Sequence, residues 1–196
     1  TVKHGGPHGR SVFITTSTDL KQWTQPELRF HADAMDQRLG HQNITDRLAD
    51  PTLQPLYYKP NPAVYNVDVY NMGIFGYEGM FIGMPAMYHA VGKEPRYPNT
   101  EGFQLIQLAC SRDLKKWKRL GNRRPFIGPS RVGSGAYDLT QIMPPSAPVL
   151  RGDELWFYYW GGKYRGGWKW VGPNGDWTTA DGSWTDGYWT VEDDFH

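Results

Sequence analysis

The sequence predicts an all-β protein, and within that class a β-propeller built from four-stranded antiparallel blades. Three observations carry this prediction. Glycine (23) and proline (15) make up almost a fifth of the 196 residues, a balance that favours many short strands joined by turns over long helices. One seven-residue phrase occurs twice, and apolar runs of strand length recur between turn residues along most of the chain.

The repeated phrase is Ser-x-Asp-Leu-Lys-x-Trp. It reads "STDLKQW" at Ser17 to Trp23 and "SRDLKKW" at Ser111 to Trp117, with five of seven positions in common. Ser and Asp side chains bond to nearby backbone N–H groups in tight turns, and a Trp that resumes the strand offers a large surface for packing between sheets. The phrase therefore predicts a structural turn between two strands, without chemistry of its own.

Residues 1–164 divide into propeller-like units. Two predicted strands end the first unit, residues 65–120 form one full blade, and residues 137–164 begin the next blade with two strands. Four-stranded units of this length are typical of β-propellers. The stretch from Asp33 to Pro62 is predicted to be irregular. The predicted strands are Ser11–Thr16, Trp23–Phe30, Val67–Phe75, Met80–Tyr88, Phe103–Ser111, Trp117–Gly121, Gln141–Leu150 and Leu155–Lys163.

Two units of strands cannot close a propeller ring. We therefore expect that the chain either is a truncated form of a longer propeller protein or completes its ring by self-association. Residues 165–196 form a tail rich in Trp and Gly, and seven of the nine tryptophans lie between Trp156 and Trp189. Two interpretations of the tail stay open: short hairpins that cover an open sheet edge, and a platform on which sugar rings stack.

Charge and composition limit the expected partners. The net charge is +1, so no global field attracts nucleic acid, and the basic run from Lys115 to Arg124 is interpreted as an exposed turn and edge strand. No segment is long and apolar enough for a membrane span, the histidines show no metal-ligand spacing, and we expect no cofactor. The single cysteine, Cys110, lies in an apolar run and is expected to be inert. Thr1 begins no visible signal peptide, and a secreted or periplasmic location is an expectation only.

Several segments together resemble a family. They are "STDLKQW", "YNVDVYNMGIFGYEGMFIGMPAMYH", "CSRDLKKWKRL" and "YDLTQIMPPSAPVLRGDELWFYYWGG". Their order and spacing are similar to the five-bladed propeller proteins related to glycoside hydrolase families thirty-two and forty-three, above all to the bacterial group described only as glycosyl-hydrolase-like. This resemblance implies a sugar-binding funnel on the propeller axis, lined by carboxylates from successive blades. It also implies an oligosaccharide or polysaccharide substrate.

Three carboxylates are the candidate catalytic residues under this resemblance. Asp68 and Asp138 each precede or enter the first strand of a blade, close to a propeller's central opening, while Glu78 occupies a predicted hairpin tip between Tyr77 and Gly79. Glycoside cleavage needs a proton donor and an ionised carboxylate on opposite sides of one bond, and a half-buried Glu78 would suit the donor. The alternative for both aspartates is a turn cap, and for Glu78 a solvated tip.

The remaining candidates would bind substrate. Asp50 lies in "RLADPT", which is similar to the Arg-Asp-Pro phrase of family thirty-two, although Ala49 replaces its arginine. The other polar and aromatic candidates are Tyr65, Asn66, Asn71, Tyr77, His89 and Trp160. The family's early blades have no counterpart here, so three hypotheses remain: a glycoside hydrolase, a non-catalytic carbohydrate-binding module, and an inactive fragment of a larger enzyme.

Overall fold

The computed structural model describes residues 2–4, 7–53, 60–93, 100–162, 168–171 and 188–191. These residues contain fourteen strands, one α-helix and three short 3₁₀ helices, and every strand pair among them is antiparallel. The prediction of a mainly β, antiparallel protein is therefore confirmed. The described strands close no barrel, and the propeller remains a prediction.

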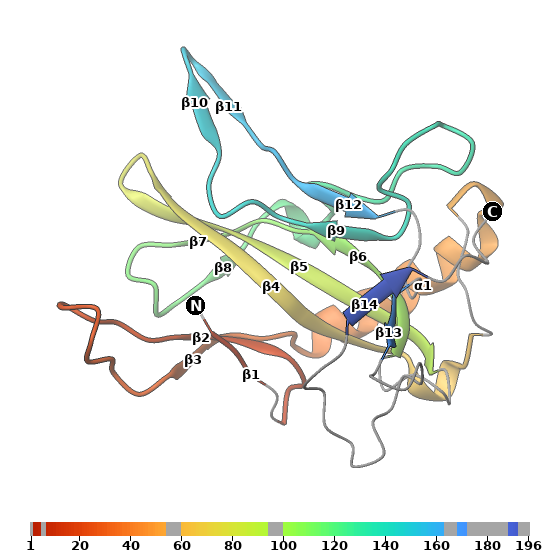
Figure 1. The fold of residues 1–196 in the computed structure, drawn as a ribbon, viewed down its shortest axis with the longest axis horizontal. Coiled ribbons are helices and arrows are strands. Elements are labelled where there is room, and N and C mark those ends of the chain that lie inside the picture. The colour runs from red at the N-terminus through yellow and green to blue at the C-terminus, as the bar shows by residue number, and fades with distance from the viewer. Residues whose placement is uncertain are drawn as a thin grey trace.

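The largest sheet lies at the centre of the molecule (Figure 1). It contains β4 (Asn66–Tyr77), β5 (Met80–Lys93), β6 (Thr100–Ile106), β7 (Ala109–Ser111) and β8 (Lys118–Arg119). The order is β4-β5-β7-β8, and β6 also pairs with β5. The four strands expected between residues 65 and 120 are thus present, but the third is divided into β6 and β7. The β4–β5 turn has positive φ at both Glu78 (48°) and Gly79 (76°), as two-residue hairpin turns require.

A second sheet contains β1 (Val2–His4), β2 (Ser11–Ile14) and β3 (Glu27–Phe30). The first copy of the repeated phrase joins β2 to β3, and the second joins β7 to β8. The two turns share the hydrogen bonds that their aspartates accept. Oδ1 of Asp19 accepts from the N–H groups of residues 21 and 22, both at 2.8 Å, and Oδ1 of Asp113 accepts from those of residues 115 and 116 at 2.8 and 2.9 Å. These bonds lower the pKa of both carboxyl groups.

The repeated turns also share one strained position. The leucine after each aspartate has a left-handed backbone, with φ of 62° at Leu20 and 60° at Leu114. Residues other than glycine, Asn and Asp rarely adopt this conformation. The two tryptophans differ in environment: Trp117 packs against the core, whereas Trp23 is 54 % exposed. The structural interpretation of the phrase is therefore confirmed for the turn, and for the packing role at Trp117 only.

The C-terminal strands are short. β9 (Gln141–Met143) pairs with β12 (Trp160–Gly162), and β10 (Val149–Arg151) pairs with β11 (Glu154–Trp156) in a hairpin that projects from the body of the molecule (Figure 1). Each of the two strands predicted here is divided in two. In the tail, β13 (Trp168–Val171) pairs with β14 (Tyr188–Val191), and the rest of the predicted hairpins lies outside the described residues.

One prediction of local structure is wrong: the stretch from Asp33 to Pro62 is not irregular throughout. It contains α1 (Ala34–Ala49) and the 3₁₀ turns η1 (Pro51–Leu53) and η2 (Pro62–Val64). Asp33 caps α1 by accepting from the backbone N–H groups of residues 35 and 36, and the Asp36 side chain accepts from the Asp33 N–H, which completes a capping box. The helix has no apolar stripe, because the four residues that it buries are Asp36, Gly40, Ile44 and Arg47.

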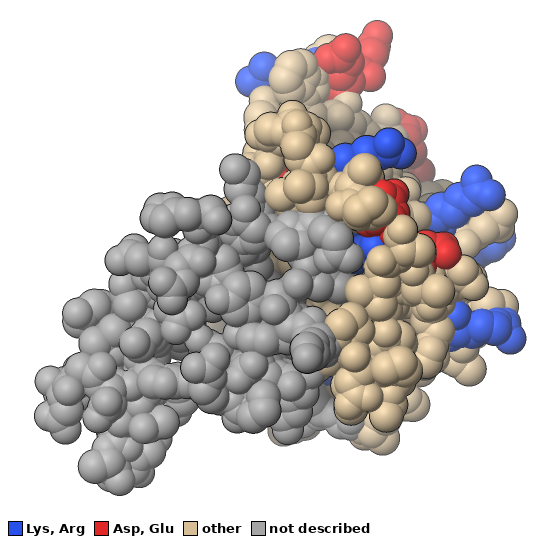
Figure 2. Space-filling view, turned by 90° about the vertical axis from the view of Figure 1, so that its right-hand side faces the viewer, with Lys and Arg blue, Asp and Glu red and all other residues tan. Residues whose placement is uncertain are grey.

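The central sheet is covered on both faces. On one face α1 and β3 pack over a core that includes Ile44, Phe30 and Val69, and α1 passes behind the sheet in Figure 1. On the other face a smaller core forms around Met84, Ile106 and Ile142. Figure 2 shows acidic and basic side chains interspersed on the described part of one side, in keeping with the low net charge. Among the described residues, no helix has the length and hydrophobicity of a membrane span.

Candidate functional site

Asp68 lies on β4 and is 7 % exposed. Its Oδ2 accepts from Nε of Arg10 at 2.7 Å, and the Arg10 guanidinium lies over the rings of Tyr70 and Tyr88, with centroid distances of 5.0 and 4.5 Å. Its Oδ1 is buried and accepts no hydrogen bond from the described residues. Asp68 is therefore one half of a largely buried ion pair that joins β4 to the segment leading into β2.

Asp138 lies just before β9 and is 4 % exposed. The hydroxyl of Tyr159 donates to its Oδ2 at 2.6 Å, and this bond raises the pKa of Tyr159, so the tyrosine remains a proton donor. Gly161 leaves room for the carboxylate, since a Cβ at this position would lie 2.6 Å from that of Asp138. Oδ1 has no donor among the described residues. The Asp138 side chain is thus held against Gly161 of β12, the residue that follows Trp160.

Glu78 is separated from Asp68 by the length of β4. It lies at the exposed tip of the β4–β5 hairpin, so the half-buried position expected for a proton donor is not observed. At about 3.3 Å per residue along a strand, the tip is roughly 30 Å from Asp68. Paired glycosidase carboxylates lie within about 10 Å of each other. The structure therefore does not bring Glu78 and Asp68 to one site.

The other candidates are dispersed. Asp50 ends α1 and accepts from the Thr52 N–H and hydroxyl at 2.9 and 2.6 Å, which lowers the pKa of Asp50. Tyr65 packs edge-on against the ring of His41 at 5.4 Å. Of the remaining four, Asn66 is exposed at the start of β4, Tyr77 is exposed near the hairpin tip, and His89 is buried. Asn71 has a buried Oδ1 that accepts no hydrogen bond within the described part of the chain.

Trp160 belongs to a row of exposed aromatic side chains. Along residues 154–160 exposed and partly buried positions alternate, so that Trp156 (41 % exposed), Tyr158 (57 %) and Trp160 (51 %) all present their rings to solvent. The intervening Phe157 and Tyr159 pack against the smaller core and anchor the segment. We call Trp156, Tyr158 and Trp160 the aromatic row.

Four contacts orient the rings of the aromatic row, and one of them is the Arg151 guanidinium, which lies over the Trp156 ring at 4.7 Å from its centroid. The six-membered ring of Trp160 lies over Gly162, where a Cβ would be only 3.2 Å from its Cη2, so the indole lies along the strand. The ring of Trp156 stacks with that of Tyr158 at 6.2 Å and 30°, and its Nε1 donates to Glu154 at 2.7 Å. Flat, exposed rings in a line offer apolar faces to the C–H face of a sugar, while their neighbours supply hydrogen bonds.

A pocket lies elsewhere among the described residues, between β3, β8 and the start of α1. It has a volume of about 680 Å³, within the range of small-molecule sites. We call it the arginine pocket, because Arg29, Arg119 and Arg123 line it together with an apolar wall. Its remaining lining residues are Phe30, His31, Asp33, Met35, Leu39, Trp117 and Asn122. A smaller pocket of about 420 Å³ shares His31 and Asp33 and is also lined by Asn66.

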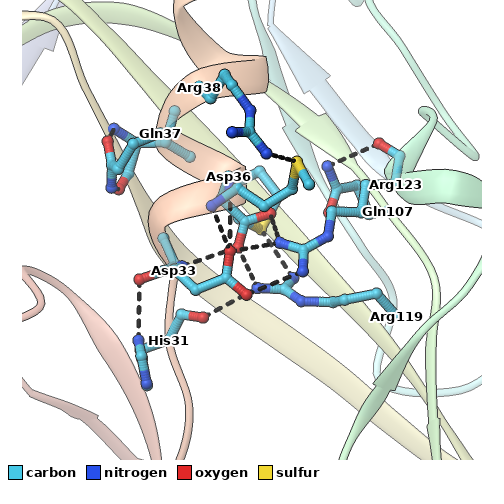
Figure 3. A network of polar contacts seen from close by, with 12 residues as sticks. His31, Asp33, Asp36, Gln37, Arg38, Gln107, Arg119 and Arg123 are labelled. Atoms are coloured by element: carbon cyan, nitrogen blue, oxygen red, sulfur yellow. Dashed lines mark hydrogen bonds and ion pairs between the residues drawn. The ribbon is translucent and has the colours of Figure 1, made fainter.

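An ionic cluster forms one side of the arginine pocket (Figure 3). Arg123 binds Asp33 through two parallel contacts of 2.6 and 2.9 Å and reaches Asp36 at 2.8 Å. Arg119 donates to Asp36 at 2.5 Å and to the carbonyl of His31 at 2.9 Å. The cluster ties the N-terminus of α1 to β8 and the following turn η3 (Gly121–Arg123).

The electrostatics of the cluster exclude Asp33 as a general acid near neutral pH. The hydrogen bonds from Arg123 hold the pKa of the Asp33 carboxyl far below its usual range, and the same bonds raise the pKa of Arg123. Burial lowers the pKa of Arg119, against the attraction of Asp36. The cluster thus has fixed charges, which suit binding rather than proton transfer.

The sequence contained two signals for this pocket. The basic run from Lys115 to Arg124 supplies both arginines of the cluster, but its lysines are exposed while Arg119 and Arg123 turn inward. The spacing of Asp33 and Asp36 matches a capping box, which would have predicted the helix. Among the described residues, no group of three His, Cys, Asp or Glu side chains could hold a metal ion.

The chain was compared with models of known protein families, with curated proteins and with solved structures, and none of the three comparisons gives a match.

Proposed function

We propose that the chain binds carbohydrate through the aromatic row. The observation that carries this proposal is the regular exposure of Trp156, Tyr158 and Trp160 on a segment whose alternate residues are anchored in the core. Exposed aromatic rings in such a patch are typical of a binding surface. The resemblance to glycosyl-hydrolase-like propellers points to the same ligand class, an oligosaccharide or polysaccharide.

The test compares exposed aromatic residues inside the aromatic row with a tryptophan of similar exposure outside it. Trp160→Ala and Tyr158→Ala should each weaken binding of a responsive oligosaccharide about five- to tenfold, as expected for the loss of one stacked ring. Trp23→Ala is the matched control, since Trp23 is 54 % exposed and lies outside the row. Calorimetric titration against a panel of plant and algal oligosaccharides measures the effect. Equal losses in the control, or full binding by both row variants, would contradict the proposal.

Hydrolysis of a glycosidic bond is the second candidate function. It is favoured by the buried carboxylate of Asp138, which lies against Gly161 beside the aromatic row and has one oxygen without a hydrogen-bond donor among the residues that the structure describes. We expect Asp138→Asn to abolish any release of sugar while oligosaccharide binding persists. Product analysis after incubation with the same panel measures this. Unchanged release by the variant removes Asp138 from the mechanism, and no release by the unmodified chain leaves the binding function alone.

A further inference from the structure

The arginine pocket is separate from the aromatic row, and its lining has an excess of positive charge. Three guanidinium groups line it, from Arg29, Arg119 and Arg123, against one carboxylate in the wall, Asp33. Asp36 lies directly behind the wall with a side-chain exposure of 1 %. With Glu27, the partner of Arg29, the three arginines are matched by three carboxylates. A ligand carboxylate would therefore take the place of the exposed Glu27 on Arg29.

The three arginines differ in how firmly they are held. Arg119 and Arg123 are fixed by Asp36 and Asp33, so their positions are set and their charges are largely balanced by these carboxylates. Arg29 pairs with Glu27, whose side chain is 60 % exposed, and such surface pairs contribute little. Arg29 is therefore the guanidinium that can turn towards a ligand, and guanidinium groups bind carboxylates in a two-pronged geometry.

The pocket also has an apolar wall formed by Met35, Leu39, Phe30 and Trp117, and the Arg119 guanidinium covers one face of the Phe30 ring at 3.9 Å from its centroid. Phe30 and Trp117 meet edge-to-face with their ring centroids 6.2 Å apart, and this contact fixes their part of the apolar wall. This wall suits the C–H face of a ring rather than a compact inorganic anion. At the mouth, the Asp33 carboxylate is 44 % exposed and remains ionised, so it can accept hydrogen bonds from hydroxyl groups.

The turn that carries Arg123 is strained and held in place. Gly121, Asn122 and Arg123 have successive positive φ values of 57°, 51° and 61°. Two of them are not glycine, and such residues persist in this conformation only where the surroundings hold them. Here the buried Gln107 donates to the Arg123 carbonyl at 2.9 Å, and Asp33 binds its guanidinium (Figure 3). The strained turn places the exposed Asn122 side chain at the pocket as a further polar group.

We propose that the arginine pocket binds a hexuronate, a sugar that carries one carboxylate. The carboxylate would pair with Arg29 in place of Glu27, the ring would lie on the apolar wall, and ring hydroxyls would donate to Asp33. The inference does not depend on the aromatic row, which it leaves free to bind or not to bind its own ligand.

Titration of the full chain with glucuronate and galacturonate, and with glucose and galactose as neutral comparators, tests the proposal. Calorimetry gives the affinity, and the indole N–H signal of Trp117 in heteronuclear NMR reports the site. We expect binding of at least one hexuronate, weakening with added salt, and no measurable binding of its neutral counterpart. Arg29→Gln should weaken binding about tenfold, the value typical of a charged hydrogen bond.

Two further variants keep the outcome clear. Leu39→Glu adds a carboxylate to the lining and should abolish hexuronate binding, whereas Arg131→Gln removes an exposed charge outside the pocket and should not change it. Trp160→Ala should also leave hexuronate binding intact, which separates this site from the aromatic row. Equal binding of neutral hexoses, full binding by Arg29→Gln and Leu39→Glu, or binding of phosphate in place of hexuronate would overturn the proposal.

Discussion

His89 is 1 % exposed, and its surroundings keep the imidazole neutral. The carbonyl of Met87, 3.1 Å away, can only accept, so Nδ1 carries the proton and Nε2 accepts from the Asn43 amide at 3.1 Å. The ring stacks on Phe103 at 4.7 Å. Burial, with a smaller effect from the nearby Arg47 cation, lowers the pKa of His89 to about 4. The residue proposed from sequence as a sugar ligand is thus inside the core.

The lowered pKa of His89 predicts that the folded state loses stability in mild acid. The unfolded chain takes up a proton at this residue near the ordinary pKa of about 6.5, and the folded chain only near 4. The stability is therefore complete above about pH 6.5 and falls as the pH drops towards 4, by roughly 3 kcal/mol in total. Urea unfolding across this range measures the loss.

A variant isolates this histidine from the others. His89→Gln should flatten the pH dependence of the unfolding free energy between about pH 6.5 and 4, although the variant starts from a lower stability. His41→Gln, at an exposed position on α1, should keep it. Asp33 does not interfere, because the stability that it contributes is lost only below the ordinary carboxyl range of about pH 4. A slope that survives His89→Gln would assign the effect to another group.

At the scale of the element, α1 shows how a helix can rest on a sheet without an apolar stripe. The four residues it buries, Asp36, Gly40, Ile44 and Arg47, contribute two ion pairs, one close approach, one apolar contact and one hydrogen bond to the Leu139 carbonyl. The close approach is at Gly40, where an added Cβ would overlap Cγ2 of Val67 on β4. Gly40 therefore sets the distance between helix and sheet.

Gly40→Ala should destabilise the protein even though alanine is the better helix former by about 1 kcal/mol. The methyl group forces α1 away from β4, and overpacking of this kind costs about 1–3 kcal/mol. Thermal and urea unfolding measure the change. Thr45→Ala, on the exposed side of the same helix, controls for propensity and should be neutral or slightly stabilising.

A double variant checks the cause of that loss. Val67→Ala removes the methyl groups that the new side chain would meet, so the loss in Gly40→Ala plus Val67→Ala should be smaller than the sum of the single losses. Additive losses would mean that the helix is not held at this point.

The elements that follow simple patterns were predictable from sequence. The long β4–β5 hairpin and the two repeated turns were expected from alternating apolar residues and from Ser and Asp at turn positions. The helix was missed because its buried stripe mixes charged, small and apolar residues. The breaks in the third central strand and in the two C-terminal strands were also missed, because apolar runs such as "LWFYYWGGK" do not reveal where strand pairing stops.

At the scale of the whole molecule, the sheets are joined by few polar contacts. The segment before β2 meets β4 through the Arg10–Asp68 ion pair and through a backbone bond of 3.0 Å from the Val69 N–H to the Arg10 carbonyl. On the opposite edge, Gln104 of β6 receives a hydrogen bond from Ile142 of β9 at 3.2 Å. These contacts align the smaller sheets with the central one.

Asp68→Asn should loosen the β2–β3 sheet more than the central sheet. The change leaves the Arg10 guanidinium without its charged partner in a site with 25 % exposure, at an expected loss of about 2 kcal/mol, below the value for a fully buried pair. Hydrogen exchange should accelerate in Ser11–Ile14 and remain slow in the middle of β5. Asp46→Asn, an exposed change on α1, provides the control. Uniform acceleration in both sheets would indicate one cooperative unit instead.

The candidate site was predictable only in part. Asp68 and Asp138 were expected to be carboxylates of a site, and both are buried, each with one oxygen that accepts no hydrogen bond from the described residues. Trp160 was expected to be a stacking surface and is exposed in a row with two further rings. The arginine pocket was not expected, because its walls come from residues 29–39 and 117–123, which meet only when α1 packs beside β3 and β8.

The repeated turn is a self-contained connector. The hydrogen bonds that its aspartate accepts lie within seven residues. The turn can therefore adopt the same backbone path at both places without contacts from other segments. What differs between the copies is the environment of the final tryptophan, which is partly buried against the core at 117 and open to solvent at 23. The two loops should therefore be interchangeable by grafting. The burial of each indole depends on the surface that it meets and not on the repeated sequence itself.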